Sequence, residues 1–520
     1  MIQPLKTLHD SFGTAATGIV ALNHTLQKAP IFEDFFKFTP RDSAFVDSQV
    51  GEVNTLTQQL FKYRATLLRN LNSHQSTICK LPPEILSEIF QFLCNLDSSE
   101  FMVPTEVGGI CSHWRQVAWS TPHLWTDLFI ERGFWKSSHR EELLDLYFTN
   151  MGELLLDLII DPPPKGSGSI LKGIVFKDVF ERLFVKHAQK LRSLKFGFEA
   201  SLRPWLPRIE EVTQSGGELR NLEELELVNG FHTDPDLTAL IMLLPEKPHT
   251  TFDNVPNLKK LVLRDISFSV SFPWAQLTEL TLSGIDSGMA LGIVLQCQDL
   301  VSLKLEYLSR SYLEIILPSE PLIFQHLQTM EYRSSSLSSL WERAFVKCLS
   351  FTDSLKSFTF LTEDGTPDLQ FLRSLPTSIT DFWLDCTGGG DNIQGLEFVL
   401  ARFVSLRCLL LRLEDPMDRK VVELLSFSKE RRFLPCLRSL SLVVHGKDYH
   451  QKDMDDMLNM VQSRLEKRDQ DVPLDEVTFS FPNGEEYRTL AANFKAQLDK
   501  ITRKDTDVYV EGQLLKQSHP

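Results

Sequence analysis

The sequence lacks the features that mark most membrane, secreted and metal-binding proteins. No run of about 18 apolar residues occurs, so no segment is expected to cross a membrane. The eight cysteines are scattered without a Cys-x-x-Cys pair, which favours buried thiols in a reducing compartment over a disulfide framework. No signal peptide is evident. We therefore expect a cytoplasmic or nuclear protein without a membrane partner.

Positive charge is also in short supply. The chain has 54 Lys and Arg residues against 69 Asp and Glu residues, which gives a formal net charge of -15. Binding to a phosphate backbone requires a basic surface, so nucleic acid is not an expected partner. With 520 residues and 42% hydrophobic content, the chain is long enough for a large core in two or more domains.

Sequence motifs for catalysis are missing as well. The sequence contains no Gly-x-Ser-x-Gly elbow and no His-x-x-Glu-His pair. The glycines at Gly388–Gly390 follow a predicted strand, but no Lys-Ser or Lys-Thr follows them, and a strand-to-helix turn is the simpler interpretation. We expect a protein that is not an enzyme and that needs no cofactor or metal.

The chain does contain a strongly patterned segment, LPPEILSEIFQFL, from Leu81 to Leu93. Pro82 and Pro83 suit the first turn of a helix, where a missing amide proton leaves no bond unmade, and Glu84 places negative charge near the positive end of the helix. The apolar residues that follow lie on one face of this predicted helix: Ile85, Leu86, Ile89, Phe90 and Leu93.

A second segment, ICSHWRQVAWSTPHLW, runs from Ile110 to Trp125. Apolar residues from Val107 to Ala118 recur at helical spacing and predict one further amphipathic helix, which includes Trp114. The polar connection Asn95–Glu106 is long, so the register of this second helix stays open. Periodicity alone allows two interpretations, a helical hairpin whose apolar face is all internal core, or one whose face is partly kept for a partner.

The order of these motifs resembles the F-box-like domain of many fungal proteins. The resemblance rests on the Leu-Pro-Pro-Glu-Ile start, the Ile-Phe pair, the Cys-x-x-Trp-Arg helix and the Pro-x-Leu-Trp exit, and it covers residues 78 to 130. It implies docking to the Skp-type adaptor of a cullin-RING ubiquitin ligase. The adaptor-binding residues implied by the resemblance are Leu81, Pro82, Ile85, Leu86, Ile89, Phe90 and Leu93, with Trp114 supporting the second helix.

Beyond this region an apolar triplet, Leu-x-x-Leu-x-Leu, recurs. Its strict form begins at Leu222, Leu258, Leu277, Leu300, Leu406 and Leu437. Looser forms begin at Leu191, Leu327, Leu355, Ile379 and Leu474. Successive triplets are roughly 19 to 37 residues apart and helical patterns lie between them, which is typical of leucine-rich repeats.

These patterns predict an α/β fold, an N-terminal helical F-box followed by an irregular leucine-rich-repeat solenoid with a curved parallel sheet. The solenoid is expected over residues 131–484, with a C-terminal helix and tail at 485–520. The segments LWTDLFI at Leu124–Ile130 and LLLDLII at Leu154–Ile160 are candidates for the first strands. The turn asparagine found in regular repeats is absent at the fifth residue after the second leucine, which points to an uneven arc.

Upstream of the F-box-like region, residues 45–75 carry a heptad-like seam of Val46, Val53, Leu56, Leu60, Tyr63 and Leu67. The seam predicts a helix, and it is short enough that local packing is favoured over a dimerising coiled coil. Residues 1–44 are predicted to be poorly ordered. The oligomeric state stays open.

Three hypotheses follow for function. The first is a substrate-recognition subunit of an SCF-type ubiquitin ligase, in which the F-box binds the adaptor and the repeat arc binds an unknown target protein. The second is a protein-interaction scaffold that uses the same two modules outside a ligase. The third, an enzyme on a repeat frame, would require a deep pocket with convergent titratable side chains.

Overall fold

The computed structural model divides into two compact units, which are described separately. The helical unit contains residues up to Leu93 together with Thr105–Val117, and the sheet unit contains Cys94–Pro104 and the chain from Ala118 onward. The structure describes residues 40–75, 77–94, 103–131, 134–161, 174–197, 206–214, 218–229, 249–266, 270–309, 320–334, 348–362, 369–385, 393–413, 419–427, 433–444, 451–465, 474–481, 485–501 and 506–511.

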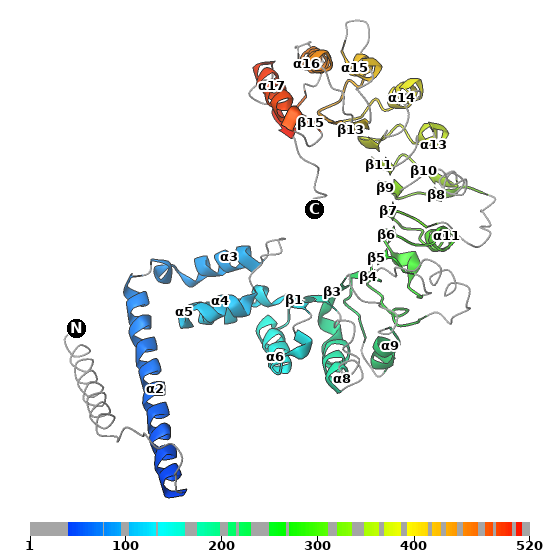
Figure 1. Cartoon of the computed structure of the whole chain (residues 1–520). Coiled ribbons are helices and arrows are strands. Elements are labelled where there is room, and N and C mark those ends of the chain that lie inside the picture. Colours follow the sequence, from blue (N-terminus) through cyan, green and yellow to red (C-terminus); the bar gives the residue numbers. More distant parts are fainter. Residues whose placement is uncertain are drawn as a thin grey trace. The chain divides into compact units, whose positions relative to one another are not determined.

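The helical unit begins with a long helix. Its elements are α2 (Pro40–Gln75), η1 (Ile78–Lys80), α3 (Pro83–Cys94), α4 (Pro104–Ile110) and α5 (Ser112–Trp119), which continues into the sheet unit (Figure 1). The predicted heptad helix is confirmed and starts at Pro40, five residues earlier than expected. The start of α3 at the double proline is also confirmed. The remainder of the segment predicted to be poorly ordered, residues 1–39, lies outside the described residues.

The single helix predicted from Val107 to Ala118 is wrong in one respect, because the structure has two helices that meet at Cys111. The N–H of Trp114 donates to Sγ of Cys111 over 3.4 Å, as an N-cap residue would accept from the third residue of a helix. The glycine pair Gly108-Gly109 ends the first of them, since glycine lowers helix stability. The predicted connection Asn95–Glu106 is correspondingly shorter, because α4 already begins at Pro104.

The sheet unit is built on a parallel sheet of 14 strands whose order follows the chain. The strands are β1 (Asp127–Ile130), β2 (Leu156–Ile160), β3 (Leu191–Phe196), β4 (Glu224–Val228), β5 (Lys260–Arg264), β6 (Glu279–Ser283), β7 (Ser302–Glu306), β9 (Thr329–Ser334), β11 (Ser357–Thr362), β12 (Asp381–Asp385), β13 (Cys408–Leu413), β14 (Ser439–Val444), β15 (Glu476–Ser480) and β16 (Asp507–Glu511). A separate parallel pair is formed by β8 (Leu322–Phe324) and β10 (Leu349–Phe351).

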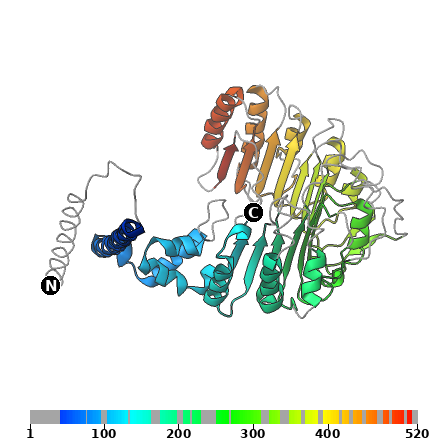
Figure 2. The ribbon, with the colours of Figure 1, turned by 60° about the horizontal axis from the view of Figure 1, so that its bottom comes forward.

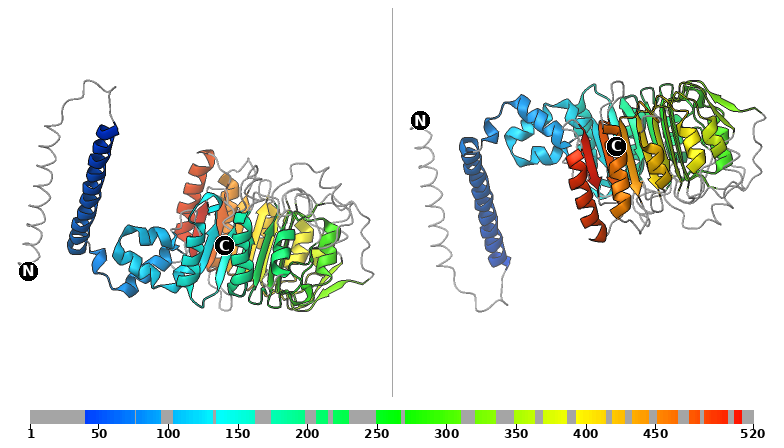
Figure 3. Two further views of the ribbon diagram at one scale, coloured as in Figure 1. Left: turned by 90° about the horizontal axis from the view of Figure 1, so that it is seen from below. Right: turned by 90° about the horizontal axis from the view of Figure 1, so that it is seen from above.

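Helices cover one face of this sheet, and the strands line the inner side of its curve (Figures 1 and 2). The views from below and from above show the strands side by side, with the helices along the outer side of the sheet (Figure 3). The helices of the sheet unit are α6 (Arg140–Met151), α8 (Ile174–Glu181), α9 (Leu206–Gln214), α11 (Ser287–Val294), α13 (Leu369–Ser374), α14 (Ile393–Leu400), α15 (Arg419–Leu425), α16 (Gln451–Leu465) and α17 (Glu485–Ile501). Short turns of other helix types are η2 (Pro122–Trp125), η3 (Phe134–Lys136), η4 (Arg182–Lys186), η5 (Ala188–Lys190) and η6 (Trp274–Gln276).

The apolar triplets form the core beneath the sheet. The second and third residues of each of the eleven triplets lie on a separate strand of the large sheet, and the first residue starts β3 or stands two positions before the other strands. Phe196 is the most exposed of the triplet residues at 4%. In register, the second and third residues of each triplet pair with those of the next, as Leu261 and Leu263 do with Leu280 and Leu282. A buried row on one strand can be covered only by its neighbours, which explains the repeated strand-helix arrangement.

The sheet extends beyond both predicted limits of the solenoid. Its first strand, β1, lies in the candidate segment Leu124–Ile130, which is also the end of the region assigned to the F-box-like domain. Trp125, just before β1, is buried and packs edge-on against Tyr147 of α6. At the other end the predicted C-terminal helix is present as α17, but β16 follows it and pairs with β15. The alternation Val508-x-Val510 was too short to be recognised as a repeat.

A row of polar side chains joins the repeats at the start of the strands. The residue immediately before a triplet donates to a backbone carbonyl of the preceding repeat at five positions, over 2.7 to 2.9 Å. These donors are Asn221, Asn257, Gln276, Ser354 and Ser378. A regular repeat has its turn asparagine after the strand. In this chain the hydrogen bonds between repeats are made by side chains that precede the strand.

Asn257 offers a direct test of this row, because its amide donates to the Arg220 carbonyl over 2.7 Å. We expect Asn257→Ala to lower the free energy of unfolding by about 0.5–1 kcal/mol, since the side chain is exposed and a net hydrogen bond contributes about this much. Asn257→Asp keeps the shape but opposes a carboxylate to the carbonyl, and should destabilise at least as much. Equal urea midpoints for wild type and both variants would show that this row of hydrogen bonds does not stabilise the fold.

No helix among the described residues is long and apolar enough to cross a membrane. The glycine segment Gly388–Gly390, interpreted above as a turn, lies outside the described residues.

Candidate functional site

The predicted adaptor-binding residues separate into buried and outward-facing groups. Leu86 and Phe90 have no exposed surface, and the Phe90 ring lies 4.9 Å from that of Trp114, centroid to centroid. Val107 of α4 is equally buried. Leu86 and Phe90 therefore form the core of the helical unit, with Trp114 packed against them, and they do not present a surface to a partner.

The opposite face of α3 is apolar and exposed. Ile85 is 48% exposed and Phe92 is 69% exposed, and their spacing of seven residues places both on the same side of the helix. Ile89 lies between them and is half-buried. We call Ile85, Ile89 and Phe92 the α3 patch. Of the other predicted residues, Pro82 is exposed, whereas Leu81, Leu93 and Trp114 are half-buried.

Phe92 was not among the residues selected from the sequence. Its spacing of seven from Ile85 could have identified it, but the resemblance to the F-box carried no role for this position. Phe92 matters because it joins Ile85 and Ile89 in one exposed apolar patch. Such patches, unlike single exposed apolar residues, mark interaction sites.

The inner face of the large sheet presents a second surface. The residue between the two buried positions of each strand points to this face, and its character changes along the arc. Phe129 and Ile159, at the first two strands, are 37% and 38% exposed. This residue is charged on β3, β4, β7 and β9, where it is Lys195, Glu226, Lys304 and Glu331, whereas β5 and β6 carry Val262 and Thr281. An aromatic and hydroxyl-bearing stretch follows from β11 onward.

The charged stretch forms one connected network around Glu306, whose side chain is only 4% exposed. Arg264 approaches a Glu306 oxygen to 3.0 Å, and Lys304 approaches the other to 3.1 Å. Arg333 lies 3.5 Å from Glu306, and Lys304 also contacts Glu331 over 3.3 Å. A buried carboxylate is stable only when paired, and three cations surround this one.

This network is electrically balanced. Arg264 additionally lies 3.5 Å from Glu226, so the network comprises three cations and three carboxylates from β4, β5, β7 and β9. Each charge is satisfied within the protein, so a ligand would have to displace an existing pair. We therefore interpret the network as a support that fixes the inner face.

The stretch that follows is less charged and carries an exposed tryptophan. Trp383 is 45% exposed, and the sheet register places it between Thr359 and Leu410 on the adjacent strands. Ser441 follows Leu410 in the same register. We call these four residues the Trp383 patch.

The pair Asp385 and Arg412, 3.1 Å apart, follows the Trp383 patch on the same two central strands. Asp385 is 2% exposed, so its charge is compensated by Arg412 and not offered to a ligand. The patch thus combines one large aromatic surface with neutral hydroxyl groups. Such a combination is suited to burying an apolar side chain of a protein partner.

Cys408 lies on β13, the strand that carries Leu410, and its environment argues against nucleophilic chemistry. Burial and the neighbouring Asp381 raise the pKa of its thiol to about 11. The thiolate is the reactive form of cysteine, and very little of it exists near neutral pH at such a pKa. The inner face therefore offers contact surface at this position, not a covalent catalyst.

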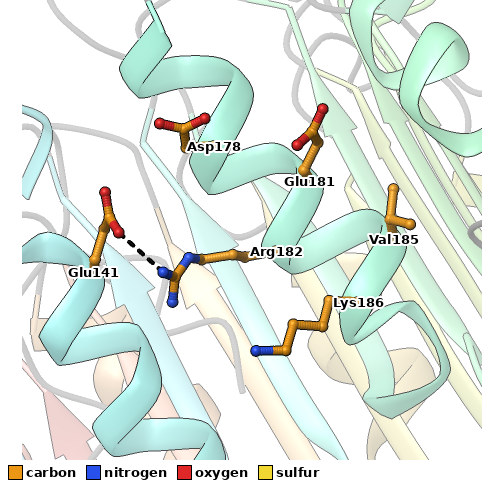
Figure 4. A pocket seen from close by; sticks show the side chains of 6 residues that line it. All are labelled: Glu141, Asp178, Glu181, Arg182, Val185 and Lys186. Carbon is orange, nitrogen blue, oxygen red and sulfur yellow. Dashed lines mark hydrogen bonds and ion pairs between the residues drawn. The ribbon is translucent and has the colours of Figure 1, made fainter.

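A groove of about 520 Å³ lies on the helical side of the sheet unit, beside α6, α8 and η4 (Figure 4). Glu141, Asp178, Glu181, Arg182, Val185 and Lys186 line it. Arg182 donates to Glu141 over 2.9 Å and also pairs with Asp145. The groove has mixed charge, and its arginine is already engaged, so it provides no convergent set of groups for an enzymatic reaction.

His187 follows η4 and stacks on Phe148, with ring centroids 3.7 Å apart and planes inclined by 10°. Burial, aided by the charges of Lys186 and Lys190, lowers its pKa from 6.5 to about 4. Between these two values the unfolded chain binds more protons than the folded chain. The stabilisation from the neutral ring is therefore present above pH 6.5 and is lost as the pH falls toward 4.

We expect His187→Phe to flatten the loss of stability between pH 6.5 and pH 4, because phenylalanine keeps the stacked ring and cannot be protonated. The measurement is the urea midpoint of both proteins across this range. His187→Phe and wild type should differ most at the acidic end. Parallel pH profiles would show that His187 does not contribute to the acid sensitivity.

Comparison with protein-family models gives no match to this sequence, and a search of the curated proteins gives none either.

Proposed function

We propose that this chain is the target-recognition subunit of an SCF-type ubiquitin ligase. The α3 patch would bind a Skp-type adaptor, and the inner face of the sheet would bind the target protein. The observation that carries the proposal is the exposure of Ile85 and Phe92 within the F-box-like segment. The repeated leucine triplets, which form a continuous core under a 14-stranded sheet, support the leucine-rich-repeat half of the proposal.

The energetics of adaptor docking follow from the α3 patch. Full burial of an isoleucine or phenylalanine side chain contributes about 1.5–3 kcal/mol, so covering Ile85, Ile89 and Phe92 supplies several kcal/mol. Leu86 and Phe90 would act indirectly by holding α3 against the rest of the unit. This division of roles refines the docking set implied by the resemblance.

The chain would contribute proximity to the ligase, not bond chemistry. A target held on the inner face keeps its lysines at high local concentration near a ubiquitin-charged enzyme that the adaptor and cullin recruit. The raised pKa of Cys408 and the mutual pairing of the charged network agree with a surface that holds a partner without reacting with it.

A reconstitution experiment separates the ligase from the scaffold hypothesis. The full chain is co-expressed with a Skp-type adaptor and a cullin and is then isolated by its own affinity tag. The ligase proposal expects a complex that holds the cullin and loses it when the adaptor is omitted. A chain that captures neither protein would contradict the proposal. Capture of the adaptor without the cullin would favour the scaffold.

The Trp383 patch gives a prediction for the target-binding half. We expect the double change Trp383→Ala and Leu410→Ala to remove partners that the wild-type chain captures, because interface energy is concentrated in a few aromatic anchors. Adaptor capture should be unaffected.

Phe398→Ala provides the matched control, since Phe398 is 53% exposed on α14. Quantitative affinity capture of the three proteins, normalised to the adaptor, is the measurement. A partner set that is the same for all three would show that the target binds elsewhere.

A further inference from the structure

The seam of α2 is left accessible by the structure. Val53, Leu56 and Leu60 are 39%, 37% and 45% exposed, and Phe61 is 64% exposed. Local packing, which the short seam favoured, is therefore not found for these residues. Tyr63 and Leu67, closer to η1, are half-buried. Successive apolar seam residues that are each more than a third exposed give a helix a face suited to packing against another helix.

Charge is distributed unequally along α2. Up to Glu52 the helix contains three acidic residues and one basic residue, whereas from Val53 to Gln75 it contains three basic residues and no acidic one. Among these, Asp47, Glu52, Lys62 and Arg64 are exposed. The helix thus has an acidic first part and a basic second part. The exposed seam residues Val53, Leu56 and Leu60 lie between Glu52 and Lys62 in the sequence.

We propose that α2 pairs with α2 of a second copy of this chain, in the antiparallel direction. Parallel pairing would set the basic part of one helix against the basic part of the other. Antiparallel pairing sets each acidic part against a basic part, so the charge pattern of one helix is complementary to itself only in this direction. This inference is independent of the proposed ligase function.

The heptad pattern fixes the register of the pair. With Val53 and Leu60 at position a and Leu56 and Tyr63 at position d, antiparallel helices pack a against d. Leu56 then faces Leu60 of the second copy, and Val53 faces its Tyr63. At the flanking g positions, Glu52 faces Thr66 of the second copy. At the e positions, the two copies of Thr57 face each other.

The pair is expected to be weak and concentration-dependent. The seam extends over about three heptads, which is near the lower limit for a stable coiled coil, and Tyr63 and Leu67 are already partly covered. The contribution from opposite charges at the surface is screened by salt. Dissociation should therefore increase both on dilution and on addition of salt.

The first test is the mass of the full chain, measured by sedimentation equilibrium over a range of protein and salt concentrations. Wild type should show a monomer–dimer equilibrium. Leu56→Asp combined with Leu60→Asp should be monomeric throughout, because four carboxylates would meet in the seam. Thr55→Asp combined with Gln58→Asp adds the same charge to exposed positions outside the seam and should retain the dimer.

The second test determines the direction of pairing with two matched changes. Thr66→Lys places a lysine opposite Glu52 in the antiparallel pair, twice by symmetry, and should lower the dissociation constant about three- to fivefold. Thr57→Lys brings two lysines together in the same arrangement and should raise it. In a parallel pair Thr57→Lys would instead meet Glu52 and strengthen the dimer, whereas Thr66→Lys would not.

Three results would overturn the proposal. One is a monomeric wild-type chain at every concentration. Another is a dimer that survives the Leu56→Asp and Leu60→Asp changes, which would place the contact elsewhere. The third is a monomer that dimerises only after removal of residues 1–39, which would identify that segment as the occupant of the seam. Circular dichroism of each variant verifies that the helix is retained.

Discussion

Replacement of Ile85 by aspartate is expected to abolish capture of the Skp-type adaptor while leaving the chain folded. Ile85 is 48% exposed on α3, so a charge there is hydrated in the free protein and buried only in the complex. Interface anchors contribute about 2 kcal/mol or more, so capture should fall at least about thirtyfold. Titration of the purified chain with the adaptor, by calorimetry or interferometry, measures this.

Two further changes make the result specific. Ile85→Leu keeps an apolar side chain of equal size and should bind like wild type. Leu86→Asp, one residue later, buries a carboxylate in the core of the helical unit and should lower its helical signal, which Ile85→Asp should not. If Ile85→Asp binds the adaptor with wild-type affinity, the α3 patch is not the docking surface.

The largest expected effect on stability comes from Phe358→Ala. Phe358 has no exposed surface, and its ring lies near those of Phe360, Phe371 and Phe382, with centroid distances of 5.8 to 6.4 Å. Removing the ring leaves a cavity bounded by three repeats, and we expect a loss of about 3–5 kcal/mol in the free energy of unfolding. Chemical denaturation measures this loss.

Phe398→Ala serves here as the matched control. The Phe398 ring is mainly exposed and lies under Arg373, 4.8 Å from the guanidinium carbon, so the same truncation should cost about 1 kcal/mol or less. Hydrogen exchange should locate the loosening caused by Phe358→Ala in β9, β11 and β12, because each strand is stabilised mainly by its neighbours. Equal denaturation midpoints for Phe358→Ala and Phe398→Ala would contradict the assigned core.

The strands could be predicted from sequence because their apolar residues have a fixed internal spacing. A triplet such as Leu277, Leu280 and Leu282 predicts both the presence of a strand and the side chains that are buried. β16 was not predicted because it carries only the alternation Val508-x-Val510, which occurs often by chance. The break between two helices at Cys111 was not predicted because the apolar spacing continues through it. Only the glycine pair Gly108-Gly109 indicated that the first helix ends there.

The candidate docking surface was predictable in part. Periodicity placed Leu86 and Phe90 with Ile85 and Ile89 on one broad apolar face, but a helix that packs on a small unit can bury only part of such a face. Which part is buried depends on the direction from which Trp114 and Val107 approach, and this is a tertiary property. The same limit applies to Trp383, because neighbours on adjacent strands are defined by register and not by proximity in sequence.

The parallel register of the strands has a consequence for aggregation, because residues at equivalent positions form rows that run from β1 to β16. A parallel sheet that grows in one direction has two unequal edges, here β1 and β16. Pairing of β16 of one copy with β1 of the next would produce a fibre. Asp127 and Asp507 occupy the same row at these two edges. Head-to-tail stacking in register would bring the two carboxylates side by side, a repulsion that disfavours polymerisation of the arc.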